Sequence, residues 1–269
     1  MELAGKTAIV TGGASGIGAA LAAELAANGV NVVVGDLDEA GAHATASSIR
    51  DAGGAAAALR ADAAAVTDIE ALITLANREF SPVDIYVANA GVIGKPGLAT
   101  ESDWDVILDV NLRAHIRAAR LLVPHWQSQG SGYFVSVASA AGLLTQLGAA
   151  GYAVSKHAAV GFAEWLAITY GDDGIGVSCV CPLGVETPLL QAVRSTDDPD
   201  ARLGASSIEQ SANVITAADV AAVTVDAIRA DRFMVLPHAE LLEMYRHKGG
   251  DYDRWVKGMR RYQRTLRAL

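Results

Sequence analysis

The chain has 269 residues, of which 51% are apolar and 19% are charged, and its formal net charge is −9. This composition supplies ample apolar material for a core and excludes an intrinsically disordered chain. The acidic balance argues against nucleic acid as the main partner, because phosphate binding needs clustered Lys and Arg. A small anionic cofactor is still compatible, since a few backbone N–H groups can hold one.

Apolar runs typical of strands alternate with helical periodicity along the chain. The predicted strands are residues 6–11, 30–35, 55–59, 83–88, 133–138, 176–181 and 233–236. The predicted helices are residues 16–28, 39–51, 66–79, 102–127, 152–170 and 217–230. Strand–helix alternation without hairpin signals indicates βαβ units. We therefore predict one α/β domain over residues 1–269: a Rossmann-type, doubly wound parallel sheet of about seven strands with helices on both faces.

Two segments depart from this rhythm. Residues 188–214 include the polar run Ser195-Thr196-Asp197-Asp198-Pro199-Asp200, and we predict a mobile substrate lid there. Residues 238–269 form a C-terminal extension whose part 245–269 carries eight basic and two acidic residues. Four of its basic residues recur at helical spacing: Arg254, Lys257, Arg261 and Arg264. We interpret them as a solvated helix face; docking on an acidic surface, such as that of a second subunit, is the alternative. The extension could also reach a neighbour's active site.

Cysteine usage and hydropathy predict the compartment. The only cysteines, Cys179 and Cys181, lie two apart in a strand-like run, so they share a face but are too distant for an unstrained disulfide. We interpret them as small buried apolar residues in a reducing, cytoplasmic compartment. We expect no signal peptide, and the least polar stretch, residues 138–154, is too short and too interrupted to span a membrane.

A glycine-rich turn joins the first strand to the first helix. It reads Thr11-Gly12-Gly13-Ala14-Ser15-Gly16-Ile17-Gly18. Glycines allow a tight turn and close approach to a pyrophosphate, and the helix N-terminus offers free N–H groups with a partial positive charge. In this strand–turn–helix context the turn predicts a dinucleotide phosphate site.

Two carboxylates follow the next two strands. Asp36 ends the second strand, where a carboxylate can accept hydrogen bonds from an adenosine ribose. A 2′-phosphate there would meet a like charge, and neither Ser15 nor Leu37 is basic to compensate. The prediction is therefore NAD rather than NADP, with a surface-turn acid as the alternative reading of Asp36. Asp62, after the third strand, could approach the adenine edge or serve near a helix N-terminus.

Three residues after the fifth strand are candidate catalytic residues, although a Tyr-x-x-x-Lys pair is common by chance and a turn serine is the alternative reading of Ser139. Tyr152 and Lys156 lie four apart on a predicted helix, so they share one face. A tyrosine with a pKa near ~10 is a poor base at neutral pH, and a neighbouring cation favours its phenolate. Ser139 directly follows a strand, at the carboxyl edge of a parallel sheet where ligands bind. Its hydroxyl could hold a substrate oxygen there.

Together with Asn89-Ala90-Gly91, Asn111 and Pro182…Thr187, these motifs resemble the short-chain dehydrogenase/reductase family in order and spacing over nearly the whole chain. The resemblance implies a catalytic tetrad of Asn111, Ser139, Tyr152 and Lys156. It implies that Tyr152 exchanges the carbinol proton, that Ser139 binds the same oxygen, and that Lys156 binds the nicotinamide ribose and lowers the tyrosine pKa. Asn111 is expected to hold a water. The implied cofactor-binding residues are Gly12, Ser15, Gly16, Ile17, Gly18, Asp36, Asp62, Asn89, Gly91, Tyr152, Lys156, Val185 and Thr187.

The sequence departs from the family pattern at two positions. Ala88 stands where the family usually has an asparagine, which removes a structural hydrogen bond near the sheet. Leu183 stands where the family has a glycine after Pro182, and glycine permits backbone angles that leucine resists. We expect Gly184 to take this turn and Leu183 to add an apolar wall near the nicotinamide.

The segments expected to line the substrate pocket are rich in leucine: Leu143, Leu144, Leu147, Leu183, Leu189 and Leu190, with Thr145 and Gln146. This lining suits an apolar secondary alcohol or ketone better than a sugar, although several of these leucines could instead be core. The histidines show no metal-ligand spacing, and we expect His157 at a surface or interface rather than in catalysis. We predict an NAD-dependent alcohol dehydrogenase or ketoreductase, without metal, that forms a homodimer or homotetramer. A silent dinucleotide-binding module, and an isomerase or dehalogenase on the same fold, are the alternatives.

Overall fold

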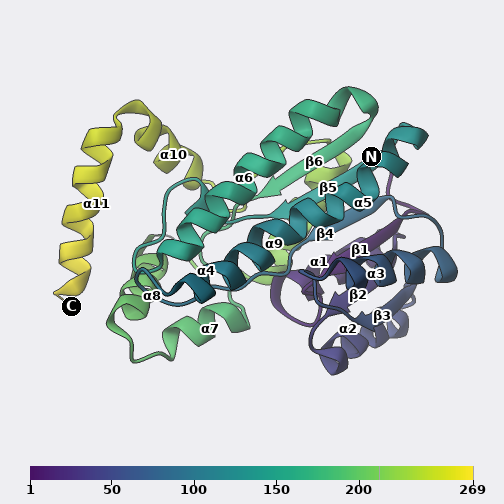
Figure 1. The fold of residues 1–269 in the computed structure, drawn as a ribbon, viewed down its shortest axis with the longest axis horizontal. Helices are drawn as coiled ribbons and strands as arrows, with labels where there is room; N and C mark the ends of the chain where they lie inside the picture. Colours follow the sequence, from purple (N-terminus) through teal and green to yellow (C-terminus); the bar gives the residue numbers. More distant parts are fainter. Residues whose placement is uncertain (212, 269) are drawn as a thin grey trace.

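The computed structural model describes residues 1–211 and 213–268. Its centre is a seven-stranded sheet in the order β3-β2-β1-β4-β5-β6-β7, with every neighbouring pair parallel (Figure 1). The strands are β1 Thr7–Thr11, β2 Asn31–Asp36, β3 Ala56–Arg60, β4 Ile85–Ala88, β5 Gly132–Val137, β6 Ile175–Val180 and β7 Met234–Val235. The strand order reverses between β1 and β4, so their carboxyl ends frame the crevice in which doubly wound sheets bind ligands. The predicted fold class is confirmed.

Helices cover both faces of this sheet. The helices of one face are α1 Gly16–Ala27, α2 Glu39–Asp51 and α9 Ala217–Arg229. Those of the other face are α3 Val66–Glu79, α5 Ala114–Gln129 and α6 Ala150–Tyr170. Side chains alternate between the two cores: Val32 and Val34 pack in the first and Val33 in the second. A strand buried on both faces must be apolar at every position, which explains the continuous valine run.

The single helix predicted over residues 102–127 is interrupted. It consists of α4 Glu101–Leu108, a π-helical turn η1 Asp109–Arg113, and α5, which ends at Gln129. In the π-turn the Ala114 N–H bonds to the Asp109 carbonyl, one residue further back than in an α-helix. Hydrophobic spacing could not reveal this insertion, because the segment continues as a helix on both sides. Asn111 lies in the middle of the turn.

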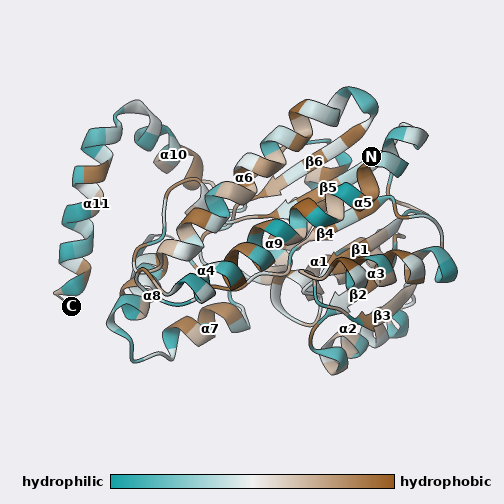
Figure 2. Cartoon of the chain, in the orientation of Figure 1, coloured by the Kyte–Doolittle hydropathy of each residue, from teal (hydrophilic) through white to brown (hydrophobic). Residues whose placement is uncertain are grey.

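Within the segments 188–211 and 238–268, four helices lie at one end of the sheet. The lid segment contains α7 Pro188–Arg194 and α8 Pro199–Ser211, joined by the polar run. The extension contains α10 Leu241–Gly250 and α11 Tyr252–Arg267, and α11 packs on both α10 and α8 (Figure 1). The hydropathy colouring of Figure 2 shows α11 as largely hydrophilic with isolated apolar positions. The extension therefore packs on α8 of its own chain, while Arg254, Lys257, Arg261 and Arg264 are exposed, as expected for a solvated basic face. Contact of this face with a second subunit stays a prediction.

Among the helices of the described residues, none is both long and apolar enough to cross a lipid bilayer.

Candidate active site

The glycine-rich turn lies directly against the loop that follows β4. Gly12 has φ +65°, and a Cβ added there would lie 2.8 Å from the Ala90 Cα. A Cβ at Gly18 would overlap the Gly12 carbonyl. Gly18 therefore makes the turn compact but does not line the cavity, whereas Gly12, Ser15, Gly16 and Ile17 do.

Two polar side chains fasten this turn to the loop after β4. The Asn89 Nδ2 donates to the carbonyls of Thr11 (2.9 Å) and Gly12 (3.1 Å). The Thr11 hydroxyl accepts from the backbone N–H groups of Asn89 (3.1 Å) and Ala90 (3.2 Å) and donates to the Val87 carbonyl (3.1 Å). The sequence analysis missed the role of Thr11. Asn89 and Thr11 make the link together, so the connection is present with Ala88 in place of the family's asparagine.

Asp36 and Asp62 both line the cavity. The Asp36 carboxylate accepts hydrogen bonds from the N–H groups of Ala14 and Asp38, each at 3.0 Å. It thereby holds the glycine-rich turn to the end of β2. The Asp62 carboxylate accepts from the Ala64 N–H at 2.8 Å. Each carboxylate keeps lone pairs free, because two carboxylate oxygens offer about four acceptor sites.

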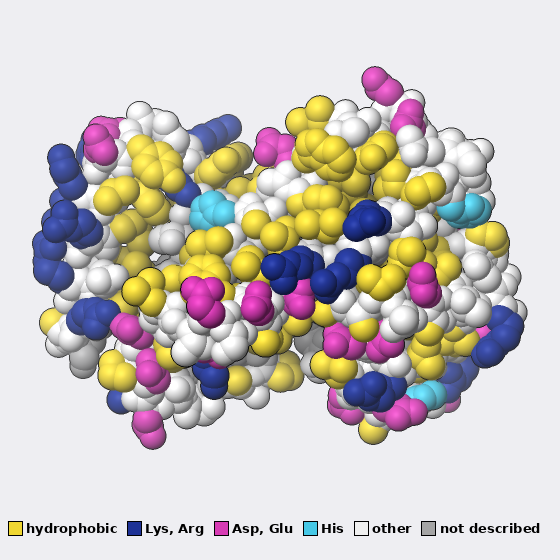
Figure 3. Space-filling model, in the orientation of Figure 1, with side chains coloured by type: hydrophobic (Ala, Val, Ile, Leu, Met, Phe, Trp, Pro, Cys, Tyr) yellow, Lys and Arg dark blue, Asp and Glu magenta, His cyan; other side chains and the backbone are white. Residues whose placement is uncertain are grey.

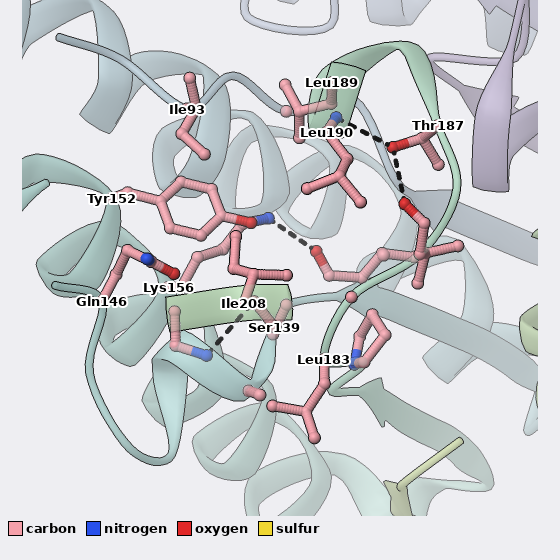
Figure 4. Close-up of a pocket in the computed structure, with 18 of the residues that line it drawn as sticks. Ile93, Ser139, Gln146, Tyr152, Lys156, Leu183, Thr187, Leu189, Leu190 and Ile208 are labelled. Carbon is pink, nitrogen blue, oxygen red and sulfur yellow. Dashed lines mark hydrogen bonds between the residues drawn. The ribbon is translucent and has the colours of Figure 1, made fainter. Parts of the chain in front are cut away.

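Ser139, Tyr152 and Lys156 meet at the carboxyl end of β5 (Figure 4). Ser139 directly follows the strand, and its Oγ accepts the Ala141 N–H at 3.1 Å. The Lys156 Nζ donates to the Val137 carbonyl at 2.9 Å and lies 5.8 Å from the centre of the Tyr152 ring. The lysine is 4% exposed. Helix α6 thus holds both residues against the end of one strand.

Burial controls the titration of this group. It raises the pKa of Tyr152 above its ordinary value of 10.0, and interaction with the Ser139 hydroxyl opposes this effect. Burial lowers the pKa of Lys156 to about 8. Desolvation of the phenolate is the first cause of the raised Tyr152 pKa, and the expected lowering of this pKa by Lys156 together with a bound nicotinamide stays a prediction. At neutral pH the phenol is protonated.

Asn111 lies behind these residues and does not line the cavity. Its side chain accepts from the Val92 N–H (2.9 Å) and donates to the Val92 carbonyl (2.8 Å) and the Ser155 hydroxyl (3.1 Å). Both N–H donors of the amide are therefore used within the protein. The side chain fastens α6 to the loop after β4, and a water bound to it could only be held by the remaining lone pair of the Asn111 Oδ1.

One continuous cavity of about 780 Å³ connects the glycine-rich turn to these residues. Beyond Tyr152 its wall is mostly apolar, with Leu144, Leu147, Leu183, Leu189 and Leu190 (Figure 4). Thr145, Gln146, Val185 and Thr187 also line it. Leu143 belongs to the core instead, which corrects the expectation that it faces the substrate.

The sequence analysis missed a further wall of the cavity. Its members come from α8, α10 and α11: Ile208, Met244, His247, Trp255, Met259 and Tyr262. A signal was present, because Trp255, Met259 and Tyr262 are spaced i, i+4 and i+7, which places them on one face of a helix. The sequence analysis interpreted this helix from the regular spacing of basic residues on its other face, and so it missed the apolar face.

Two histidines join the extension to the rest of the site. The His238 Nδ1 accepts from the Leu183 N–H, and its Nε2 contacts the Asn213 carbonyl, each at 3.2 Å. His157 is exposed, in agreement with the predicted surface position, and its Nε2 lies 3.2 Å from the Nζ of the buried Lys248 of α10. Leu183 keeps a negative φ, so the turn after Pro182 does not need glycine.

A third histidine makes the fold sensitive to acid. His115 is buried, its Nε2 has no partner among the described residues, and burial beside the Lys156 ammonium lowers its pKa from 6.5 to about 3. The unfolded chain binds the proton first, so this residue's contribution to the free energy of unfolding is complete above pH 6.5 and falls as the pH drops toward 3. We expect a slope of about 1.4 kcal/mol per pH unit.

Urea unfolding of His115→Gln beside the unchanged protein, at pH 7, 6 and 5, checks this expectation. Glutamine can still bond the Ser136 hydroxyl, which lies 3.1 Å from the His115 Nδ1, but it cannot titrate. The stability of the variant should therefore depend less on pH. Parallel pH profiles of the two proteins would show that His115 does not supply this acid sensitivity.

The described residues contain no group of three or more His, Cys, Asp or Glu side chains placed to hold a metal ion. The fold and the cavity instead define a dinucleotide-binding oxidoreductase, with a glycine-rich turn at the strand-order reversal and a Ser/Tyr/Lys group at the neighbouring strand end. The family model for short chain dehydrogenase matches residues 6–198. The chain belongs to the short-chain dehydrogenase/reductase family.

Relatives with stated activities extend this assignment. The chain is 31% identical over 264 residues to 1-deoxy-11-beta-hydroxypentalenate dehydrogenase of Streptomyces exfoliatus, covering 95% of this chain and 91% of the relative. It is 34% identical over 235 residues to cis-4-hydroxycyclohexanecarboxylate dehydrogenase of Sinomonas cyclohexanicum, covering 84% and 94%. A short-chain dehydrogenase/reductase of Burkholderia phymatum, solved in complex with NAD, superposes with a TM-score of 0.85 at 30% identity, covering 94% of this chain and 96% of that one.

Proposed function

We propose that this protein is an NAD-dependent oxidoreductase that interconverts an apolar secondary alcohol and its ketone. The observation that carries the proposal is the single cavity lined by the glycine-rich turn, by Asp36, and by Ser139, Tyr152 and Lys156. Cofactor and substrate sites would then share one domain. Residues 188–211 and the extension would enclose the substrate.

The residues present fit a nicotinamide dinucleotide. Glycine at position 12 lets the turn pack closely on Ala90 and Asn89. The N-terminus of α1, which follows the turn and lines the cavity, would offer backbone N–H groups to a pyrophosphate. The Asp36 carboxylate retains acceptors for an adenosine ribose and opposes a 2′-phosphate. Asp62 and Asn89 would border the adenosine. Val185 and Thr187, on the loop after β6, would meet the nicotinamide carboxamide.

When bound, the nicotinamide would accept or supply the hydride. In the direction of ketone reduction, Tyr152 would donate its phenolic proton to the substrate oxygen, consistent with its raised pKa. The Ser139 hydroxyl would bond the same oxygen and stabilise its developing charge. Lys156 would bind the ribose. Asn111, through its bonds to Val92 and Ser155, would keep α6 in position.

The substrate class follows from the cavity wall. Leucines beyond Tyr152 offer dispersion contacts and few polar partners, which suits a hydrocarbon skeleton with one reacting oxygen. Both named relatives act, by their names, on hydroxyl-bearing carbon rings. A cyclic aliphatic alcohol is therefore the first substrate to try.

A homodimer or homotetramer is also proposed. Exposed apolar side chains on α4 and α6 support it: Val106 is 58% exposed, Trp165 53% and Ile168 78%. Exposed large apolar side chains on these two helices favour an interface. The unpaired, buried Cys179 and Cys181 are consistent with a reducing cytoplasm.

The direct test is absorbance at the NADH band during a screen of secondary alcohols with NAD and with NADP in parallel. Formation of NADH with at least one cyclic alcohol is the expected result. Demonstrable NAD binding without turnover of any alcohol or ketone would contradict the dehydrogenase proposal and favour a silent binding module.

A further inference from the structure

The C-terminal extension forms the far wall of the substrate cavity, opposite the family's catalytic residues. We propose that α11 selects substrates through Trp255, Met259 and Tyr262, and that Lys248 is the positioning residue that holds this wall in place. The proposal rests on the dehydrogenase function above and names its substrate more closely. The substrate is an alcohol whose apolar skeleton is large enough to extend from Tyr152 to α11.

The two faces of α11 differ in chemistry. Trp255, Met259 and Tyr262 are half-buried and line the cavity. Arg254, Lys257 and Arg261 are exposed on the outer side, and Figure 3 shows Lys and Arg side chains along this edge of the molecule. Substrate would therefore meet only the aromatic and thioether side chains, which give contact area and adaptable packing.

The helix has few other attachments. Apart from α10, α11 packs mainly on α8, and Leu266 is its one fully buried side chain among the described residues. An ion pair between Arg267 and Asp200 (2.7 Å) is half exposed and adds little. The Tyr262 hydroxyl donates to the Ser207 carbonyl of α8 at 3.5 Å. The position of the wall is therefore set by α8 and by α10, which precedes it.

Lys248 supplies that attachment. It is only 5% exposed, and its Nζ donates to the carbonyls of Leu143 and Leu144, each at 2.7 Å. The ammonium also lies 5.4 Å from the Tyr252 ring centre and 5.1 Å from that of Trp255. Lysine is almost never this buried unless its charge is compensated. Here two carbonyl dipoles and two aromatic faces compensate it, and one of those rings belongs to the substrate wall.

His157 completes the attachment from the catalytic helix. Its Nδ1 lies 2.8 Å from the Ala153 carbonyl and its Nε2 lies 3.2 Å from the Lys248 Nζ. Nδ1 must donate to a carbonyl, which leaves the Nε2 lone pair to accept from the ammonium. Lys248 thereby joins the extension to α6, one residue after Lys156, and to the loop that follows Ser139. The substrate wall and the reacting residues are therefore both held against α6 and the loop that follows Ser139.

Lys248→Met tests the attachment, with Lys257→Met on the outer face of α11 as the matched control. Each variant is assayed with cyclohexanol and with a multi-ring hydroxysteroid. We expect Lys248→Met to raise KM for the large alcohol about tenfold or more, with KM for cyclohexanol and kcat for both changed less than about threefold. Lys257→Met should leave all four values unchanged. Lys248→Arg, which keeps a cationic donor, should recover part of the loss.

Met259→Ala tests the wall itself without disturbing the attachment. We expect it also to raise KM for the large alcohol selectively. Equal loss with both alcohols in Lys248→Met and Met259→Ala would overturn the proposal, because the extension would then support the fold without selecting substrate. Unchanged kinetics with both alcohols in both variants would overturn it as well.

A readout without turnover separates this proposal from the dehydrogenase proposal. Trypsin cuts after Arg and Lys, which are numerous on α11. Under native conditions, trypsin should cleave the extension from the Lys248→Met variant several-fold faster than from the Lys257→Met variant. If no alcohol reacts but this difference is found, the attachment stands and only the assigned reaction fails. Equal cleavage rates would remove Lys248 as the positioning residue.

Discussion

Tyr152→Phe should lower kcat for the best secondary alcohol about 10³-fold while NAD binding stays within about threefold. Tyr152 and Lys156 both lie on α6, line the cavity and carry exchangeable protons. The Lys156 Nζ donates to the Val137 carbonyl, whereas the Tyr152 phenol interacts with the Ser139 hydroxyl and is the group we expect to exchange the substrate's proton. Loss of a positioned general acid or base typically costs 10²–10⁴-fold in rate. Phenylalanine keeps the ring and its packing, so the loss would report the proton rather than the shape.

The rate of alcohol oxidation should also depend on pH differently in Tyr152→Phe and in the unchanged protein. Because burial raises the pKa of Tyr152, ionisation of the phenol is delayed to higher pH than for a free tyrosine. Alcohol oxidation needs a proton acceptor, so its rate in the unchanged protein should climb with pH across the alkaline range. The small residual rate of Tyr152→Phe should lack this rise.

Tyr170→Phe is the matched control, since Tyr170 lies at the end of the same helix and outside the cavity. It should keep nearly full activity, measured as initial rates of NADH formation and as NAD binding by calorimetry. A Tyr152→Phe enzyme with more than a tenth of the normal kcat would assign the proton transfer to another group.

The sheet was predictable because its physical signal is local and repeated. A strand covered on both faces needs apolar residues in succession, and the run Val32-Val33-Val34 has this pattern. The helices of both faces were also found, because each repeats apolar residues at helical spacing. The π-turn at Asn111 was not found, because one extra residue within a continuing helix hardly changes the pattern.

The motif residues of the site could be predicted from the sequence, but the helices that enclose the cavity could not. Spacing placed Tyr152 and Lys156 on one helix face, and they do line one cavity. The wall from α11 was missed because the helix is mostly charged, and a basic face is ordinarily read as solvated. Lys248 was missed for a related reason: the carbonyls and the histidine that surround its ammonium belong to residues 91 to 105 positions away. Only the three-dimensional structure brings such partners together.

Asp36→Asn should weaken the preference for NAD over NADP about 10–100-fold in kcat/KM. The carboxylate lines the cavity beside the glycine-rich turn, and no Arg or Lys stands at Ser15 or Leu37 to attract a 2′-phosphate. Hydrogen bonds from a ribose to a charged group contribute about 1.5–3 kcal/mol, and each 1.4 kcal/mol is a tenfold change. Adding Leu37→Arg to Asp36→Asn should move the preference further toward NADP, because Leu37 is 56% exposed at the same end of the cavity.

Asparagine is chosen because Asp36 also has a structural task. Its oxygens hold the N–H groups of Ala14 and Asp38, and the amide oxygen of asparagine can keep one of these bonds. Asp38→Asn is the control: it removes an equal charge two residues away, from a side chain that bonds the Gly41 N–H and does not line the cavity. Initial rates with both cofactors should change in Asp36→Asn and not in Asp38→Asn. If Asp36→Asn and the unchanged protein prefer NAD equally, Asp36 only holds the glycine-rich turn in place. Other residues of the cavity would then have to determine the choice of cofactor.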